Sequence, residues 1–211
     1  GNSREEHTLA FRRYVGDTKK TVIFYNRPGT VAGTAFLTWD YADQTRDDDQ
    51  WLYLPALRKV RRISASDRGD YFLGTDLTYE EIKKESKIAA EDYQFSLIGE
   101  EEVDGHHTWK VEATPIDQEV SRALGYGRVV LRVDSILWIP RLSEYWDVTG
   151  NFLKTVQARD IQKIDGIWAI TDIEASNKKT GHNTRIQFKN TDYKAAIPER
   201  FFQQNDLKRG Y

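Results

Sequence analysis

The sequence predicts a mainly β protein whose strands form an antiparallel up-and-down meander with a few short helices. Apolar and polar residues alternate with a period of two along the whole 211-residue chain, as in half-buried strands. Turn signals such as Asp104-Gly105 and Asp165-Gly166 separate these segments, and tight turns of this kind join neighbouring antiparallel strands. The chain also contains 6 Trp, 11 Tyr and 9 Phe, residue types that strands favour.

The expected strands follow one another with short connections. In the first part of the chain they span Thr8 to Val15, Thr21 to Tyr25, Thr34 to Tyr41, Trp51 to Leu54 and Arg58 to Ile63. In the second part they span Tyr93 to Glu100, Thr108 to Thr114, Arg128 to Asp134, Arg141 to Trp146, Phe152 to Gln162, Ile167 to Ser176 and Thr184 to Tyr193. Consecutive short turns favour neighbouring antiparallel strands over βαβ units. The simplest architecture is one sheet that carries one or two inserted helices.

Three segments break the strand pattern and predict helical structure. The segment Thr75 to Lys84 offers Thr75 or Thr78 as a cap, with acidic residues first and lysines later, as the helix dipole prefers. A second short helix is expected over Asp117 to Leu124, because a glycine follows it directly. Near the end of the chain, Pro198 to Phe202 is expected to form a helical turn that places two Phe rings against the sheet.

Composition and charge narrow the classes of function. With 30% charged and 39% hydrophobic residues, the chain has an ordinary globular composition, and we expect a single domain over residues 1–211. Its net charge of −2 gives no bias towards nucleic acid, which we do not expect as a partner. The absence of cysteine excludes disulfides and thiolate chemistry. No apolar run approaches the roughly 20 residues of a membrane span, so any membrane contact is expected to be peripheral.

No motif in the sequence points to catalysis or to a metal. There is no Gly-x-Ser-x-Gly nucleophile elbow and no His-Glu-x-x-His zinc pattern. His106 and His107 are adjacent, and adjacent strand side chains point to opposite faces, so we interpret both as surface residues. The acidic run Asp47 to Asp49 lacks the spaced ligands of a calcium loop and is interpreted as an exposed turn. We therefore expect no enzymatic activity, no metal site and no cofactor.

Several ordered blocks of the sequence carry a family resemblance. They are Gly33 to Tyr41, Asp49 to Ile63, Gly74 to Glu80, Gly99 to Gly105, Lys163 to Trp168 and Asn177 to Thr184. The second block runs from an acidic triplet through an aromatic strand and a Pro55 turn into a basic strand. Together they resemble the outer-membrane lipoprotein-sorting protein family, relatives of the periplasmic carriers LolA and LolB. The resemblance covers most of the chain, roughly from Thr21 to the end.

The resemblance implies a curved, antiparallel, unclosed half β-barrel with short helices over its concave face. It also implies a periplasmic carrier that binds lipid or lipoprotein acyl chains in an apolar cavity, for transport or sorting to the outer membrane. Compared with the family, we expect the first helix and part of the first strand to be missing from this sequence. No signal peptide is present, and we expect one to lie outside the sequence.

Large apolar and aromatic residues are the candidates for lining such a cavity. They are Trp39, Tyr41, Trp51, Tyr53, Phe72, Leu73, Leu77, Tyr79 and Trp109. Trp39 and Tyr41 share one face of their strand with Ala35 and Leu37. For each residue alone, ordinary core packing is an equally good interpretation, so both interpretations stay open.

A dense basic patch lies on the strand that follows Pro55. It consists of Arg58, Lys59, Arg61 and Arg62. We expect it to contact an anionic lipid headgroup or an acidic partner, such as an envelope membrane protein or exporter. The competing interpretation is an edge strand whose charges prevent pairing with other chains.

Two other functions compete with the carrier. A protein that holds a lipid in a cavity needs only catalytic groups there to act on that lipid. A lipid-processing hydrolase on the same fold is therefore the first alternative. Carboxylates clustered inside the cavity, or a histidine there with a shifted pKa, would support it. The second alternative is an accessory protein that docks on an envelope lipid exporter through the basic patch without carrying cargo.

Overall fold

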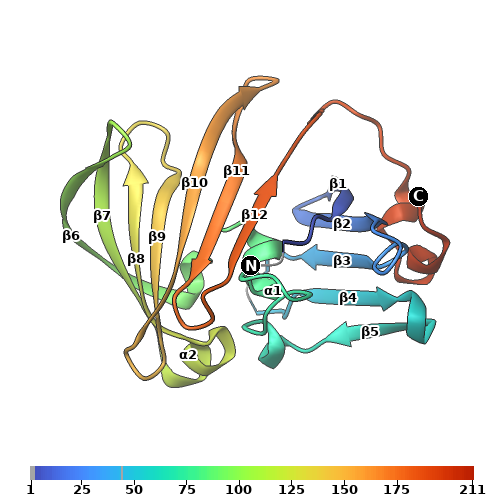
Figure 1. Cartoon of the computed structure of the whole chain (residues 1–211), viewed down its shortest axis with the longest axis horizontal. Coiled ribbons are helices and arrows are strands. Elements are labelled where there is room, and N and C mark those ends of the chain that lie inside the picture. The colour runs from blue at the N-terminus through green and yellow to red at the C-terminus, as the bar shows by residue number, and fades with distance from the viewer. Residues whose placement is uncertain (1–2, 44) are drawn as a thin grey trace. The chain divides into compact units, whose positions relative to one another are not determined.

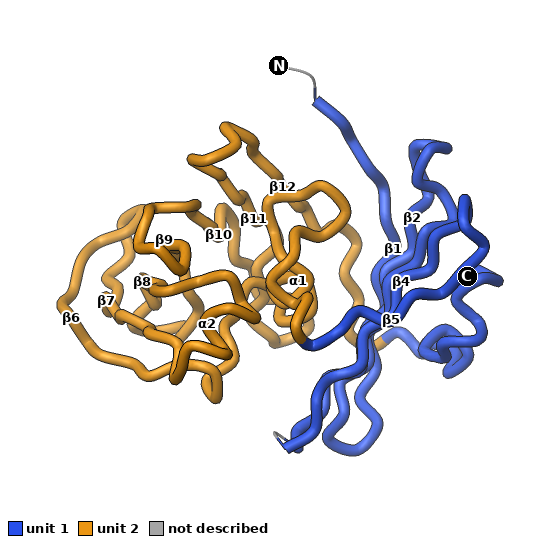
Figure 2. Tube along the Cα trace, turned by 90° about the horizontal axis from the view of Figure 1, so that it is seen from below, with its two compact units in different colours: residues 1–65, 195–211 blue, residues 66–194 orange. Residues whose placement is uncertain are grey.

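A computed structural model describes residues 3–43 and 45–211 of the chain. The chain divides into two compact units, which Figure 2 shows in different colours. Unit 1 consists of residues 1–65 and 195–211, and unit 2 consists of residues 66–194. Each unit is built on its own antiparallel sheet. No helix among the described residues has the length and apolar character that crossing a membrane requires.

Unit 1 contains a five-stranded antiparallel sheet with the strands in chain order. The strands are β1 (His7–Val15), β2 (Thr18–Arg27), β3 (Ala35–Asp40), β4 (Asp49–Leu54) and β5 (Lys59–Ile63). A short 3₁₀ helix, η1 (Pro55–Leu57), joins β4 to β5 and ends at Arg58 in the left-handed conformation (φ 49°). Strands β1 and β5 are therefore the edges of this sheet.

The core of unit 1 lies between its sheet and the C-terminal segment. The 3₁₀ helices η4 (Glu199–Phe202) and η5 (Gln204–Arg209) bring Phe202 and Leu207 into the core, where both are buried. Phe201 is half-buried and stacks on Phe11 of β1 with ring centroids 5.3 Å apart. The expected helical turn at this end of the chain, with two Phe rings against the sheet, is confirmed.

Unit 2 contains a seven-stranded antiparallel sheet with consecutive strands side by side (Figure 1). The strands are β6 (Tyr93–Val103), β7 (His106–Pro115), β8 (Tyr126–Asp134), β9 (Pro140–Asp147), β10 (Phe152–Ile164), β11 (Ile167–Asn177) and β12 (Asn183–Gln187). Strands β6 and β12 are the two edges, so the sheet is not closed. The Asp104-Gly105 and Asp165-Gly166 turns have positive φ at both residues, as hairpin turns of this type require.

Two short helices belong to unit 2. Helix α1 (Tyr79–Lys84) is preceded by Thr78 as its cap, one of the two threonines expected in this role. Helix α2 (Gln118–Leu124) is capped by Asp117, whose side chain accepts the Val120 N–H, and ends at Gly125 (φ 78°). The apolar residues of both helices join the sheet in one core cluster, which includes Leu77, Leu124 and Tyr145.

The predicted fold class is confirmed, since the chain is mainly β, antiparallel and unclosed, with few short helices. The strands form two hydrogen-bonded sheets, however, where we expected one. The segment between β5 and β6 holds 3₁₀ turns and α1, and it offers no strand to continue the ladder. Strand β12 also ends at Gln187 instead of Tyr193, and Arg58 lies outside β5. The single-domain assignment and the missing N-terminal helix stay predictions.

Candidate functional site

The first candidate site is a buried polar cluster around Glu81, at the start of α1. The Thr78 hydroxyl accepts the Glu81 N–H at 3.2 Å, and Glu81 Oε2 accepts the Thr78 N–H at 2.8 Å. This reciprocal pair is a capping box, which the Thr-x-x-Glu spacing encodes locally. The Glu81 carboxylate is thereby held in one orientation, with its second oxygen turned towards the sheet.

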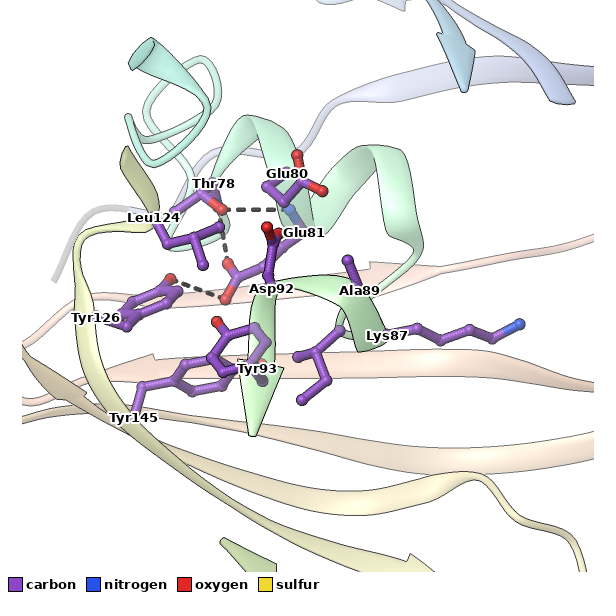
Figure 3. Close-up of a pocket in the computed structure, with 11 residues that line it drawn as sticks. Thr78, Glu80, Glu81, Lys87, Ala89, Asp92, Tyr93, Leu124, Tyr126 and Tyr145 are labelled. Carbon is purple, nitrogen blue, oxygen red and sulfur yellow. Dashed lines mark hydrogen bonds between the residues drawn. The ribbon is translucent and has the colours of Figure 1, made fainter. Parts of the chain in front are cut away.

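Strand β10 supplies the cation that faces this carboxylate. Lys154 is fully buried, and its Nζ donates to Glu81 Oε2 at 2.7 Å and to the Asp76 carbonyl at 2.7 Å. Tyr126 Oη donates to the other Glu81 oxygen, Oε1, at 2.9 Å (Figure 3). A buried charge pair of this kind is tolerated only when hydrogen bonds satisfy both partners. We call Glu81, Lys154, Tyr126 and Asp76 the Glu81 cluster.

Further hydrogen bonds tie the same segment to the edge strand β12. The Asp76 N–H donates to Thr184 Oγ1 at 2.9 Å, and Thr184 Oγ1 donates to Asp76 Oδ2 at 2.8 Å. Tyr71 Oη accepts from the Asn177 side-chain amide at 2.9 Å. The segment that carries α1 is therefore fixed to β10, β11 and β12 by polar contacts as well as by its apolar core residues.

The tyrosines of this region have strongly perturbed pKa values. Burial, and then the nearby negative charge of Glu81, raise the pKa of Tyr126 and that of Tyr145 well above the ordinary value. Burial and Glu81 likewise raise the pKa of Tyr93. These phenols stay protonated at neutral pH and do not act as bases, and the hydroxyl of Tyr126 donates to Glu81.

These pKa shifts predict a loss of stability at alkaline pH. In the unfolded chain a tyrosine loses its proton near pH 10, whereas the buried Tyr126 and Tyr145 retain theirs. Their contribution is fully present below about pH 10 and is lost as the pH rises further. Urea unfolding should show a midpoint that falls as the pH rises above about 10. The fall should be shallower in a Tyr126→Phe/Tyr145→Phe variant, and equal slopes would contradict the prediction.

A small pocket lies beside the Glu81 cluster (Figure 3). Its volume is about 20 Å³, which is room for roughly one water molecule. Three carboxylates line it, and each has a cation beside it. Glu81 binds Lys154, Asp92 binds Arg68 through two hydrogen bonds of 2.9 and 3.0 Å, and Glu80 lies 2.8 Å from Lys83. The carboxylates hold the fold together, and the pocket has no space for a lipid substrate.

Four of the predicted lining residues belong to unit 1. Trp51 is buried in its core, against which Trp39 and Tyr53 pack. The two Trp rings meet edge to face with centroids 5.1 Å apart, and Trp39 Nε1 donates to the Phe202 carbonyl at 3.0 Å. In this unit the aromatic residues therefore fill the space between the sheet and the C-terminal 3₁₀ helices.

Tyr41 lies in a polar cluster at the β3–β4 turn. Its hydroxyl donates to Asp49 Oδ2 at 2.7 Å, and the Arg46 guanidinium lies 3.6 Å from its ring centre. Burial, followed by the bond to Asp49, raises the pKa of Tyr41 to about 12. Asp48 accepts the Tyr41 N–H at 2.8 Å. The acidic run is thus more than the exposed turn we expected, because Asp48 and Asp49 organise this turn.

The other predicted lining residues belong to unit 2, and most of them are packed. Phe72 and Leu77 are buried, and Phe72 meets the Tyr79 ring edge to face at 5.3 Å. Leu73 has a left-handed backbone (φ 45°) and is half-buried in the turn before α1. Trp109 lies half-buried on β7, and its ring meets the His107 ring edge to face at 5.1 Å.

Trp109 belongs to a partly exposed apolar surface on β6, β7 and β8. The register places Leu97 opposite Val111, Phe95 opposite Ala113, and Trp109 opposite Val133. Directly opposite residues share a face of the sheet, and Ala113, Val111 and Val133 belong to or pack against the core cluster. We define the open apolar face as Phe95, Leu97, Trp109, Val111 and Val133. The helical segment packs on one part of this sheet face, while Leu97 remains 64% exposed.

The basic patch lies at the β5 edge of the unit 1 sheet. Lys59, Arg61 and Arg62 are exposed, and Arg62 binds Asp49 Oδ1 through Nη2 at 2.6 Å. Arg58 lies in the turn before the strand, and not on the strand as we expected. A hollow of about 320 Å³ elsewhere in unit 1 is lined by Arg12, Arg13 and residues 195–197. None of these residues was among the sequence-predicted candidates.

The described residues contain no group of three or more acidic or histidine side chains placed to hold a metal. His106 and His107 are exposed, and His107 Nε2 lies 2.9 Å from Glu100. Sequence reasoning missed Phe95 and Leu97 of the open apolar face, and it missed the Glu81 cluster, including Lys154. A signal was present, because Lys154 lies two positions before Val156 and four before Ala158 on the inward face of a strand.

Comparison with known proteins identifies the family. A family model described as "Uncharacterized protein" matches residues 17–209. No curated protein matches the chain. The crystal structure of a "putative outer membrane lipoprotein-sorting protein domain" from Vibrio parahaemolyticus is 30% identical, with a TM-score of 0.84 over 97% of this chain and 84% of that one.

Two further crystal structures agree with this match. A DUF1329 family protein from Desulfovibrio piger is 30% identical, with a TM-score of 0.86 over 96% of this chain and 83% of that one. A LolA superfamily protein from Nitrosomonas europaea is 20% identical, with a TM-score of 0.64 over 95% of this chain and 90% of that one, a likeness of fold. The chain therefore belongs to the family of these outer membrane lipoprotein-sorting and DUF1329 proteins, and its fold is LolA-like.

Proposed function

We propose that this protein is a non-enzymatic periplasmic carrier that binds the acyl chains of a lipid or lipoprotein for transport or sorting to the outer membrane. The observation that carries the proposal is the open apolar face, which leaves Phe95 and Leu97 exposed to solvent on an inner sheet surface. The name of the Vibrio parahaemolyticus relative supports the same cargo class. Leu97 is 64% exposed and Phe95 is 44% exposed, whereas the pocket beside the Glu81 cluster has room for about one water molecule.

The energetics suit transient binding. Each methylene of an acyl chain that leaves water contributes about 0.8 kcal/mol, so a few methylenes on an exposed face give weak to moderate affinity. The face continues into the packed core around Ala113 and Leu131. A bound acyl chain would therefore lie on a rigid surface. A carrier must release its cargo, and an open surface permits release without unfolding of the sheet.

The test places a charge on the open apolar face. We expect Leu97→Lys to lower the affinity for acyl chains at least about tenfold, because a cation in the contact must be desolvated. Ser96→Lys is the matched control, since Ser96 is the exposed neighbour on the other face of β6, opposite Glu112. Binding is measured by native mass spectrometry with lipid extraction, after expression in a bacterial envelope. Equal lipid binding by both variants would refute the proposal.

A further inference from the structure

The most exposed large apolar residues of the described chain lie in one loop of unit 2. The β8–β9 connection, residues 135–139, exposes Ile136 by 82% and Trp138 by 72%. The loop contains no charged residue. Single exposed apolar residues are common on protein surfaces, but two of this size on one uncharged loop form a compact apolar tip.

The loop is held rigidly in this conformation. Asp134 Oδ1 accepts the N–H groups of Ile136 and Leu137 at 2.8 Å each, and Arg141 Nε donates to Asp134 Oδ2 at 2.6 Å. The Trp138 N–H donates to the Asp134 carbonyl at 3.0 Å. The Asp134 side chain is almost completely buried. Ile136 and Trp138 are thus presented to solvent by a braced turn, and they do not fold back onto the sheet.

Trp138 also carries backbone strain. Its φ of 57° lies in the left-handed region, which a bulky side chain adopts only when the surroundings impose it. Such strain gathers at binding and switch sites, because stability alone would select glycine or asparagine at this position. A strained, exposed tryptophan next to an exposed isoleucine indicates that the loop has a binding role.

A second apolar hairpin leaves the sheet at the same end. In an antiparallel meander alternate turns lie at one end, so the β6–β7, β8–β9 and β10–β11 turns lie together (Figure 1). After the β10–β11 turn, Ile167 and Trp168 are about half exposed, and Lys163 Nζ lies 5.8 Å from the Trp168 ring centre.

From these features we infer that the β8–β9 loop is a membrane-docking element that inserts Ile136 and Trp138 into the interface of a lipid bilayer. Two separate tryptophan-bearing hairpins at one end of a sheet fit a broad surface better than a pocket in a single partner. Tryptophan prefers the level of the lipid headgroups, where its ring is half in water and half in apolar surroundings. The absence of charge in the loop avoids the cost of taking an ion out of water. The inference does not depend on the carrier function.

The test is flotation of the protein with vesicles of phosphatidylethanolamine and phosphatidylglycerol. The variant Ile136→Ser/Trp138→Asn removes the apolar tip, and asparagine tolerates the left-handed backbone, so the fold is kept. Taking one large apolar side chain out of water changes partitioning by roughly tenfold or more, so we expect at least a tenfold loss of vesicle binding. Val148→Ser is the matched control, because Val148 is an exposed apolar residue in the turn at the opposite end of β9.

Three results would overturn the inference. They are a wild-type protein that does not bind vesicles, equal binding by wild type and double variant, and an equal loss in the Val148→Ser control. A concentration-dependent dimer that the double variant loses, seen by sedimentation without lipid, would assign the loop to self-association instead. The carrier function is tested separately, since Leu97→Lys should lose bound lipid while it still floats with vesicles if docking and carriage are independent.

Discussion

Replacement of Lys154 by methionine is expected to lower the free energy of unfolding of the protein by about 3–5 kcal/mol, the usual cost of removing one partner of a buried ion pair. Lys154 is fully buried, and its loss leaves the Glu81 carboxylate without its cation. Tyr126 and the Thr78 N–H still bind that carboxylate, but they do not neutralise its charge.

The size of this effect depends on the charge left behind, and a second substitution tests that explanation. In Lys154→Met/Glu81→Gln the amide oxygen accepts the Thr78 N–H and the amide N–H₂ donates to Tyr126 Oη, and no uncompensated charge is buried. We expect the double variant to be more stable than Lys154→Met alone, which is a coupling that a cavity or packing defect would not produce. Urea unfolding supplies the free energies, and hydrogen exchange at α1 and β10 locates the change.

Lys110→Met is the matched control for Lys154→Met. Lys110 is half-buried on β7, and its Nζ lies 3.6 Å from Glu101. Ion pairs that solvent reaches contribute about 0–1 kcal/mol, so this variant should stay close to the wild type. A Lys154→Met protein within about 1 kcal/mol of the wild type would show that the Glu81 cluster does not hold unit 2 together.

Truncation of Phe202 to alanine is expected to destabilise unit 1 by about 3–5 kcal/mol, as for other fully buried Phe residues. Phe202 is completely buried between the C-terminal 3₁₀ helices and the sheet, beside Trp51 and Leu207. Its removal leaves a cavity that neighbouring strands cannot close, since hydrogen bonds fix their spacing. The Trp39 Nε1 bond to the Phe202 carbonyl is a main-chain contact and remains possible.

Hydrogen exchange is the measurement that separates this effect from one on unit 2. Protection should fall in β2, β3 and β4 while β7 to β10 keep theirs. Arg200→Ala is the control, because Arg200 is an exposed residue of the same 3₁₀ helix, in contact with the Phe201 ring. Its effect should stay below about 1 kcal/mol. Equal loss of protection in both units would mean that the C-terminal segment stabilises more than the sheet on which it packs.

The local elements were readable from the sequence because their causes are local. Alternation of side chains set most strand positions, and the Asp-Gly turns set the hairpins within a residue or two. The Thr78 cap and the glycine after α2 likewise act over three or four residues. The ordered sequence blocks indicated the family, and the family implied the fold that the related crystal structures share.

The roles of individual aromatic residues were not readable in the same way. Trp39 and Trp51 fill a core that only the C-terminal 3₁₀ helices complete, and these lie about 150 residues further along the chain. Tyr41 looks like its alternating neighbours in sequence, yet it follows β3 and binds Asp49. Leu97 has the pattern of a buried strand residue, but it lies on an edge strand where no further element covers it.

The sequence by itself determined the class of fold, the order of the strands and the family, since these follow from short-range periodicity, turn chemistry and ordered motifs. Only the tertiary structure decided the division into two sheets, the pairing of Lys154 with Glu81 across 73 positions, and which apolar residues stay open. The physical reason is that burial and charge pairing depend on elements far away in the chain. The neighbours of a residue in the sequence do not determine which distant residue will pack against it or pair with its charge.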